Sequence, residues 1–234
     1  MSVLDAAQPA SIATKLRASF FGPPGSGKTT LLGTAEKMLV IDVDGGTDSI
    51  RNTDAKVIKV KTWDEFKDIV KALVMEKHNY ESVSVDTVTM LQELAGIKAD
   101  LMGHIISDKK DARQAYGDIG AMIRHQLMML SQGDFHLFFT AHIRDREKAE
   151  ITKGQYPLVP DLTPAITKMF VAIPSVIGRL YLEQTGPLPT DLEHRVAFGP
   201  ETISPAKQRD LGLPPVVAGL TIPKLLTLVT QEAK

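Results

Sequence analysis

The chain contains no cysteine. This excludes disulfide bonds, a thiolate nucleophile and cysteine-based zinc sites, and it is consistent with a reducing compartment. Long apolar runs are missing as well, since no stretch approaches the roughly 20 apolar residues that a membrane-spanning helix needs. The first fourteen residues have neither the basic segment nor the apolar core of a secretory signal. We therefore expect a cytoplasmic protein without a membrane partner.

An excess of charge of either sign is also lacking. The 27 lysines and arginines nearly balance the 28 acidic residues, and the formal net charge is −1. No overall positive field attracts nucleic acid, so any such binding must use local groups. The length of 234 residues and the 43% hydrophobic content are sufficient for one large domain, or for a domain with a small appendage.

The most informative feature that is present is a phosphate-binding loop of the form G-x-x-x-x-G-K-[ST]. It lies between a strand-like run and a helix-forming stretch, Thr30 to Met38, which is the context that the motif requires; the alternative is an ordinary turn rich in glycine and proline. Lys28 is expected to reach the β- and γ-phosphates of ATP, and Thr29 to bind Mg²⁺. The expected nucleotide-binding residues are Gly22, Pro23, Pro24, Gly25, Ser26, Gly27, Lys28, Thr29 and Thr30.

Strand-like and helix-like segments alternate along the chain, which predicts an α/β fold with a mostly parallel sheet and helices on both faces. Strands are expected at Leu16–Phe21, Met38–Val43, Lys56–Val60, Ser82–Val85 and Phe135–Ala141. Helices are expected at Trp63–Lys77, with Thr62 and Glu65 forming a capping box, and at 88–103, 117–132 and 164–172. Val176–Glu183 and His194–Phe198 predict a β-hairpin.

Three regions follow from this pattern. Residues 1–14 are expected to form a flexible tail, and residues 15–198 an ATPase core that ends in the hairpin. Residues 199–234 contain five prolines, and we expect them to pack on the core or on a neighbouring subunit. Within the core, His104–Tyr116 and His142–Thr163 lack periodicity and are interpreted as loops.

Acidic residues at two strand ends are candidate partners of the phosphate loop. Asp86 ends the strand Ser82–Val85 and is expected to hold Mg²⁺, although an aspartate there is also a common helix N-cap. Thr87 follows it, where ring ATPases of the AAA type place a catalytic glutamate, and this disfavours that class. Asp44 lies beyond the end of the preceding strand and is expected to orient the attacking water; the more buried Asp42 is interpreted as structural. The alternative for Asp44 is a simple turn with Gly45.

His142 follows the apolar strand Phe135–Ala141 and precedes a long irregular segment. A polar side chain in this position is able to contact the γ-phosphate and the following loop at once, which would couple nucleotide state to loop order. The alternative is a surface or capping histidine.

Taken together, these residues resemble the RecA ATPase core. Ile41-Asp42-Val43-Asp44 is similar to its Ile-Asp-Ala-Glu segment, Val85-Asp86-Thr87-Val88 to its Val-Asp-Ser-Val segment, and Thr140-Ala141-His142-Ile143-Arg144 to its Ile-Asn-Gln-Ile-Arg segment. The resemblance covers most of residues 15–226 and is strongest to the small phage-encoded proteins with a RecA-like core that anneal single strands.

The resemblance implies several properties that the residues alone do not. The segments 104–116 and 144–163 would correspond to the two DNA-binding loops, with Tyr116 and Tyr156 as candidate stacking rings. Lys207 and Arg209 would contact the γ-phosphate bound by a neighbouring subunit, so ATP would promote a homo-oligomeric ring or filament. Single-stranded DNA, and other recombination or replication proteins, are then the expected partners.

These observations favour an ATPase that binds single-stranded DNA and promotes strand annealing in phage recombination, in the host cytoplasm. Lys28, Asp44 and His142 are the expected catalytic residues. Two alternatives remain open. One is a nucleotide or small-metabolite kinase, for which Arg144 and Arg146 are the only candidate lid pair; the other is an ATP-gated interaction module with little turnover.

Overall fold

Nine strands form one mixed sheet in the computed structural model, which describes residues 15–101, 112–146, 156–199, 203–209 and 211–231. The order across the sheet is β11-β9-β8-β1-β5-β4-β2-β3, and β10 also pairs with β8. The strands are β1 (Arg17–Phe21), β2 (Met38–Asp42), β3 (Lys56–Lys59), β4 (Ser82–Asp86), β5 (His136–Ala141), β8 (Val176–Gln184), β9 (Leu192–Ala197), β10 (Lys207–Gln208) and β11 (Val216–Ala218).

The central pairings are parallel, from β3 through β2, β4, β5 and β1 to β8. β8 and β9 form the predicted antiparallel hairpin, and β11 extends it. All five residues of β2 and of β4 are buried, because helices cover both faces there; this explains the nearly continuous apolar sequence of β2. The carboxyl ends of the parallel strands meet at one edge, where open α/β sheets bind ligands.

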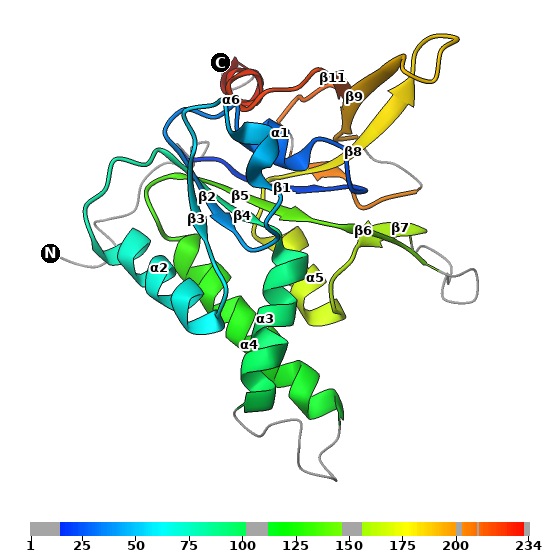
Figure 1. Cartoon of the computed structure of the whole chain (residues 1–234). Coiled ribbons are helices and arrows are strands. Elements are labelled where there is room, and N and C mark those ends of the chain that lie inside the picture. The colour runs from blue at the N-terminus through cyan, green and yellow to red at the C-terminus, as the bar shows by residue number, and fades with distance from the viewer. Residues whose placement is uncertain (1–14, 102–111, 147–155, 200–202, 210, 232–234) are drawn as a thin grey trace, which may run out of the picture.

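Six helices and one 3-10 turn pack around the sheet in the described part of the chain. They are α1 (Lys28–Leu32), α2 (Trp63–Met75), α3 (Val88–Leu101), α4 (Ala112–Leu130), α5 (Pro164–Ala172), α6 (Ile222–Gln231) and η2 (Thr47–Ile50). Figure 1 shows α2 to α5 on one face of the sheet and α1 with α6 on the other. Each face has its own buried apolar cluster. The predicted α/β class, with helices on both faces and a C-terminal hairpin, is therefore confirmed.

The described residues after position 210 cover the face that carries α1. Leu213, Leu220, Ile222 and Leu225 are buried in its apolar cluster, and the backbone N–H of Ile222 donates to Oγ1 of Thr34 at 2.8 Å. This contact ties α6 to the turn that follows α1. Among the residues that the structure describes, no helix combines the length and the apolar character needed to span a bilayer.

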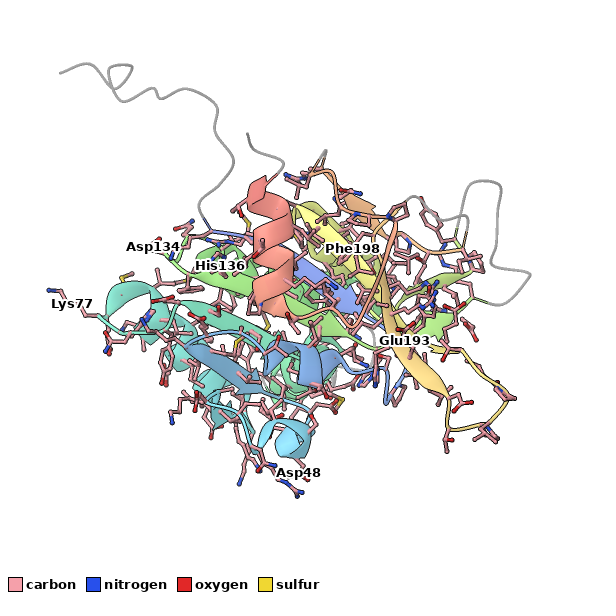
Figure 2. The ribbon with its side chains drawn as sticks, turned by 90° about the horizontal axis from the view of Figure 1, so that it is seen from above. Asp48, Lys77, Asp134, His136, Glu193 and Phe198 are labelled. Carbon is pink, nitrogen blue, oxygen red and sulfur yellow. The ribbon has the colours of Figure 1, made fainter. Side chains whose placement is uncertain are left out.

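Arg17 fixes the end of the sheet that lies away from the site. Its guanidinium donates to the carbonyls of Phe135 at 2.6 Å, Gly133 at 2.7 Å and Ser131 at 3.0 Å. These carbonyls belong to the turn between α4 and β5, near Asp134 and His136 in Figure 2. The fork of donors on one arginine thus satisfies several backbone acceptors that no strand or helix pairs.

Two helix predictions were wrong in their bounds. The helix expected from Thr30 to Met38 ends at Leu32, because Gly33 closes it and two short turns lead directly into β2. The helix expected at 117–132 begins at Ala112, so residues 112–116 of the predicted loop His104–Tyr116 are helical. The remaining residues of that predicted loop, 104–111, lie outside the described residues. By contrast, α5 begins and ends where predicted, and Thr62 and Glu65 form the predicted capping box.

The expected irregular segment His142–Thr163 contains a small antiparallel sheet instead. β6 (Ile143–Asp145) pairs with β7 (Leu158–Pro160), and residues 147–155 lie outside the described part. Three-residue strands have too little alternation to be recognised in a sequence. The same reason explains why β10 and β11 were not predicted.

Candidate active site

The phosphate loop joins the carboxyl end of β1 to α1. Gly25 and Gly27 have φ values of +77° and +90°, in the left-handed region that side-chain-bearing residues rarely adopt. A Cβ built on Gly25 would meet nothing within 4 Å, so this residue is glycine for its backbone shape and not for lack of space. The loop therefore has the curled backbone that turns successive N–H groups toward an anion.

Lys28 begins α1 and is 7% exposed. Its Nζ donates to the carbonyl oxygens of Gly22 at 2.9 Å and Pro23 at 3.0 Å, within its own loop. Burial lowers the pKa of Lys28, while the carboxylates of Asp86 and Asp44 act in the opposite direction. A buried cation beside a curled loop is the arrangement that binds a polyphosphate.

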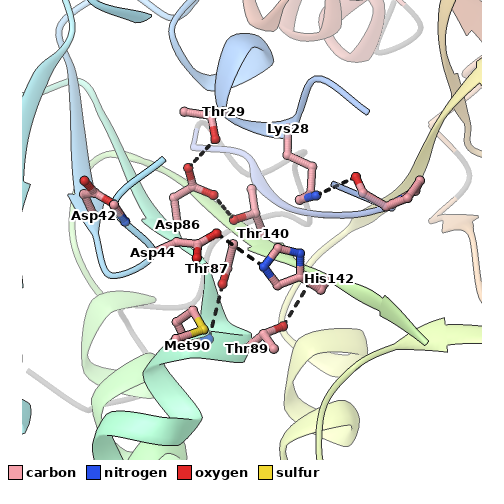
Figure 3. Close-up of polar contacts among 12 residues, drawn as sticks. Lys28, Thr29, Asp42, Asp44, Asp86, Thr87, Thr89, Met90, Thr140 and His142 are labelled. Carbon is pink, nitrogen blue, oxygen red and sulfur yellow. Dashed lines mark hydrogen bonds and ion pairs between the residues drawn. The ribbon is translucent and has the colours of Figure 1, made fainter. Parts of the chain in front are cut away.

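Asp86 ends β4 beside the phosphate loop. Its Oδ2 accepts from Oγ1 of Thr29 at 2.7 Å, and its Oδ1 accepts from Oγ1 of Thr140 on β5 (Figure 3). Burial raises the pKa of this carboxyl, although the two hydroxyl donors and Lys28 favour the charged form. A carboxylate and a hydroxyl in contact are the oxygen ligands that Mg²⁺ prefers, so Thr29 and Asp86 fit the metal that the sequence predicts.

Asp42 and Asp44 differ in their surroundings, although both belong to the end of β2. Asp42 is 2% exposed and accepts from the N–H of Gly45 at 2.7 Å and from Oγ1 of Thr47 at 3.1 Å. It therefore shapes the turn. The N–H of Asp44 donates to the carbonyl of Asp86 at 3.3 Å, and its side chain, 32% exposed, faces the cavity described below.

His142 follows β5 and faces Asp44. Its Nε2 lies 3.3 Å from Oδ2 of Asp44, and its backbone N–H donates to Oγ1 of Thr89 on α3 at 3.0 Å (Figure 3). Its other ring nitrogen, Nδ1, is buried and has no hydrogen-bonding partner among the described residues. His142 thus stands between the carboxylate at the end of β2 and the strand β6 that begins at the next residue.

A cavity of about 450 Å³ brings these groups together. It contains Lys28 and Thr29 of the loop, Asp86 and Asp44 of two strand ends, and His142. Its remaining lining residues are Pro24, Gly25, Gly27, Thr30, Gly46, Ser49, Thr87 and His194. Gly22, Pro23 and Ser26 belong to the same loop but do not line the cavity. The sequence thus predicted residues that the fold gathers at one place.

Sequence reasoning missed His194. This residue lies on β9, and its Nδ1 is 3.1 Å from the carbonyl oxygen of Ser26 in the phosphate loop. A Cβ on Gly27 would approach the same nitrogen to 2.9 Å, so the ring packs against the loop backbone. No motif surrounds His194, and only the pairing of β8 with β1 brings the hairpin next to the loop.

Lys207 and Arg209 do not line the cavity of their own chain. Lys207 Nζ donates to the carbonyl of Val171, and Arg209 Nη2 donates to that of Ala172 at 2.6 Å. Both acceptors lie at the end of α5, where the helix dipole favours cations. Burial lowers the pKa of Lys207, and the neighbouring charge of Arg209 does so too. β10 pairs with the start of β8, whereas the phosphate loop follows the end of β1.

Comparison with known proteins shows a matching family and a similar solved structure. The family described as AAA domain matches residues 14–209. The crystal structure of a KaiC-like protein from the hyperthermophilic archaeon Pyrococcus horikoshii OT3 aligns with a TM-score of 0.43 and 12% sequence identity, over 88% of this chain and 89% of that chain. A search of curated proteins found no significant match.

The match corrects one expectation. Thr87 after Asp86 disfavoured the AAA type on sequence grounds, yet the family covers the chain from before β1 to β10. Thr87 lines the cavity and is no carboxylate, so Asp44 is the acid that faces the phosphate loop alongside Asp86. Given the complete phosphate loop and the matched length, the chain belongs to the AAA domain family of P-loop ATPases.

Proposed function

We propose that this ATPase binds single-stranded DNA and couples ATP hydrolysis to the annealing of complementary strands, in phage recombination. The contact of Asp44 with His142 is the observation that supports the coupling. It joins the proposed catalytic carboxylate to His142, two residues before the segment 144–163 that the RecA-like resemblance assigns to DNA.

The proposed chemistry uses the cavity groups in separate roles. Lys28 neutralises charge on the β- and γ-phosphates, and Asp44 orients the attacking water for in-line displacement. Thr29 and Asp86 hold Mg²⁺, which supplies further neutralisation of phosphate charge when bound. Asp44 is one carbon shorter than the glutamate of the RecA core, a reach shorter by about 1.5 Å. Because misplacement on that scale costs about 10²-fold, we expect slow turnover.

The proposed DNA contact lies on the antiparallel pair β6–β7. Arg144 is on β6 and Tyr156 precedes β7, with 37% of Tyr156 exposed. Cations attract the DNA backbone and an exposed ring stacks on bases. Since Arg144 lies 4.0 Å from Asp161 and acidic residues are interleaved along the segment, we expect weak binding by one chain and a need for several chains.

An assembly also follows from the proposal. Lys207 and Arg209 lie away from their own phosphate loop, so a contact with ATP would require a neighbouring chain. ATP shared between two chains would then stabilise a ring or filament. Arg209→Ala is expected to reduce ATP-dependent assembly, measured by light scattering, without changing the affinity of the single chain for ATP. Unchanged assembly would contradict this role.

The test of the proposed function is steady-state ATP hydrolysis with and without single-stranded DNA over a series of salt concentrations. We expect DNA to stimulate phosphate release and the stimulation to fade as salt rises, because phosphate contacts release counterions. Annealing of two complementary labelled oligonucleotides is measured in parallel, and Lys28→Ala is expected to abolish both activities.

Two other outcomes would replace the proposal. Transfer of phosphate to a nucleoside monophosphate would identify a kinase with Arg144 and Arg146 as its lid. Tight ATP binding without turnover, with or without DNA, would identify a nucleotide-gated interaction module. If DNA leaves the rate of ATP hydrolysis unchanged, the proposed dependence on DNA is wrong and the assignment as an ATPase stands.

A further inference from the structure

A second cavity, of about 270 Å³, adjoins the phosphate loop on the side of the β8–β9 hairpin. It lies between α1, the hairpin and the segment that leads into α6, elements that lie side by side in Figure 1. Its walls are largely apolar, with Leu31, Leu180, Val196 and Leu220 contributing side chains. A cavity of this kind is near the lower size limit of small-molecule sites and suits a flat apolar ring system.

The two cavities share three residues, Gly27, Thr30 and His194. A single ligand that begins with phosphates in the first cavity and ends in the second must pass these residues. A nucleoside triphosphate has this form: a charged chain, a polar sugar and a flat ring. The shared residues lie where the sugar would connect the other two parts.

The hydrogen bond of His194 determines which of its nitrogens is available there. The carbonyl oxygen of Ser26 can only accept, so Nδ1 of His194, 3.1 Å away, must carry a proton. In the neutral ring, Nε2 is then an acceptor, and no residue in the described part of the chain donates to it. An acceptor beside the path of a sugar pairs with a hydroxyl group.

We propose that the second cavity, hereafter the nucleoside cavity, holds the base of the bound nucleotide, and that His194 accepts a hydrogen bond from a ribose hydroxyl. The proposal rests on the assignment of the chain as a nucleotide-binding ATPase, but not on DNA binding. It makes the hairpin a specificity element, since His194 favours ribonucleotides over their deoxy forms. It also explains why His194 packs against Gly27, as that packing places the ring at the junction.

The test is equilibrium binding by calorimetry, with inorganic triphosphate as the probe that occupies the phosphate loop alone. For the wild type we expect ATP to bind tighter than inorganic triphosphate by at least about fivefold, the lower end for stacking a base. His194 bonds one of the two ribose hydroxyls. Removal of that hydroxyl, in 2′-deoxy-ATP or in 3′-deoxy-ATP, should weaken binding by about 2- to 10-fold, the value of one hydrogen bond.

Two variants separate the parts of the proposal. His194→Ala should bind ATP and its 2′- and 3′-deoxy forms equally. Leu220→Trp fills the nucleoside cavity and should remove the advantage of ATP over inorganic triphosphate. Leu188→Trp is the matched control, because Leu188 is 59% exposed at the turn of the hairpin, and it should behave as the wild type.

Each contrary result has a definite meaning. If Leu220→Trp still binds ATP more tightly than inorganic triphosphate, the assignment of the cavity is overturned. If Leu220→Trp loses only self-association, the cavity instead binds a second copy of the chain, and the assignment is overturned as well. Equal wild-type affinity for ATP and both deoxy forms overturns the role of His194. Lys28→Ala that still binds inorganic triphosphate would instead contradict the phosphate loop, and with it the ATPase.

Discussion

Nε2 of His142 lies 3.3 Å from Oδ2 of Asp44, and the two residues come from strands that are not neighbours. β4 lies between β2 and β5, and Asp86 at its end binds the backbone of Asp44 through its carbonyl oxygen. Three strand ends therefore converge on one carboxylate. We therefore expect a change in the partners of Asp44, such as the arrival of a γ-phosphate, to alter the contact with His142.

Asp44→Asn is expected to reduce ATP hydrolysis by at least about 10²-fold, the lower limit for loss of a general base. Binding of Mg²⁺ and ATP should persist, because Thr29, Asp86 and the loop are unchanged. The measurement is phosphate release under saturating ATP, with affinity measured separately. Asp42→Asn is the comparison: normal hydrolysis in Asp44→Asn together with loss of hydrolysis in Asp42→Asn would mean that the catalytic carboxylate is Asp42.

His142→Ala is expected to uncouple DNA from hydrolysis. The ratio of ATPase rates with and without single-stranded DNA should fall to about one, since no coupling free energy would remain between the two sites. His142→Gln places the amide of the RecA core at this position and should keep part of the stimulation. If DNA stimulates His142→Ala as strongly as the wild type, the coupling runs through another residue.

Asp86→Asn is expected to stabilise the ligand-free protein and to abolish Mg²⁺-dependent hydrolysis. Burial raises the pKa of Asp86 above its ordinary value of 3.8, so the folded chain holds this proton more tightly than the unfolded chain does. The contribution of the Asp86 carboxyl to the free energy of unfolding is therefore fully present below pH 3.8, and it is lost as the pH rises through the raised pKa. Each kcal/mol regained should raise the melting temperature by about 2–4 °C.

The pH dependence is the control for that variant. The difference in melting temperature between Asp86→Asn and the wild type should be largest at neutral pH and should shrink as the pH falls into the carboxyl range. If Asp86→Asn melts below the wild type at neutral pH, the hydrogen bonds that the hydroxyls of Thr29 and Thr140 donate to the charged Asp86 carboxylate outweigh the cost of its burial.

Arg17→Met is expected to destabilise the fold by about 2 kcal/mol, because several backbone carbonyls lose charged donors. This corresponds to a melting temperature lower by about 4–8 °C for a chain of this size. Arg124→Met on α4 removes the same charge from an exposed position and should change stability by less than about 0.5 kcal/mol. Equal effects of the two substitutions would mean that the Arg17 contacts contribute nothing measurable. Calorimetric unfolding measures both.

The sequence was most informative where a motif and a strand end coincide. The glycine-rich loop leads into Lys28 and Thr29, and two strand ends carry Asp86 and Asp44. Parallel strands place their carboxyl ends at one edge of the sheet. Their meeting in one cavity was therefore predictable. The buried role of Asp42 was predictable from its depth, because Asp42 still belongs to the strand whereas Asp44 lies beyond the carboxyl end.

The parts that could not be predicted depend on contacts between distant segments. His194 reaches the phosphate loop only because β8 pairs with β1, and no spacing in the sequence encodes that pairing. The pair β6–β7 is three residues on each strand, too short for a visible alternation. The five-residue length of α1 was missed because the apolar residues that continue to Met38 belong to a turn and then to β2.

Lys28 spends the ligand-free state bonded to two neutral oxygens of its own loop. In the proposed complex, a polyphosphate would replace these neutral dipoles with full negative charges as the partners of the buried ammonium group. The loop therefore keeps its cation in position at the cavity by internal bonds. Substitutions at Gly22 or Pro23 that reorient those carbonyl groups are therefore expected to change the affinity for nucleotide, although neither residue lines the cavity.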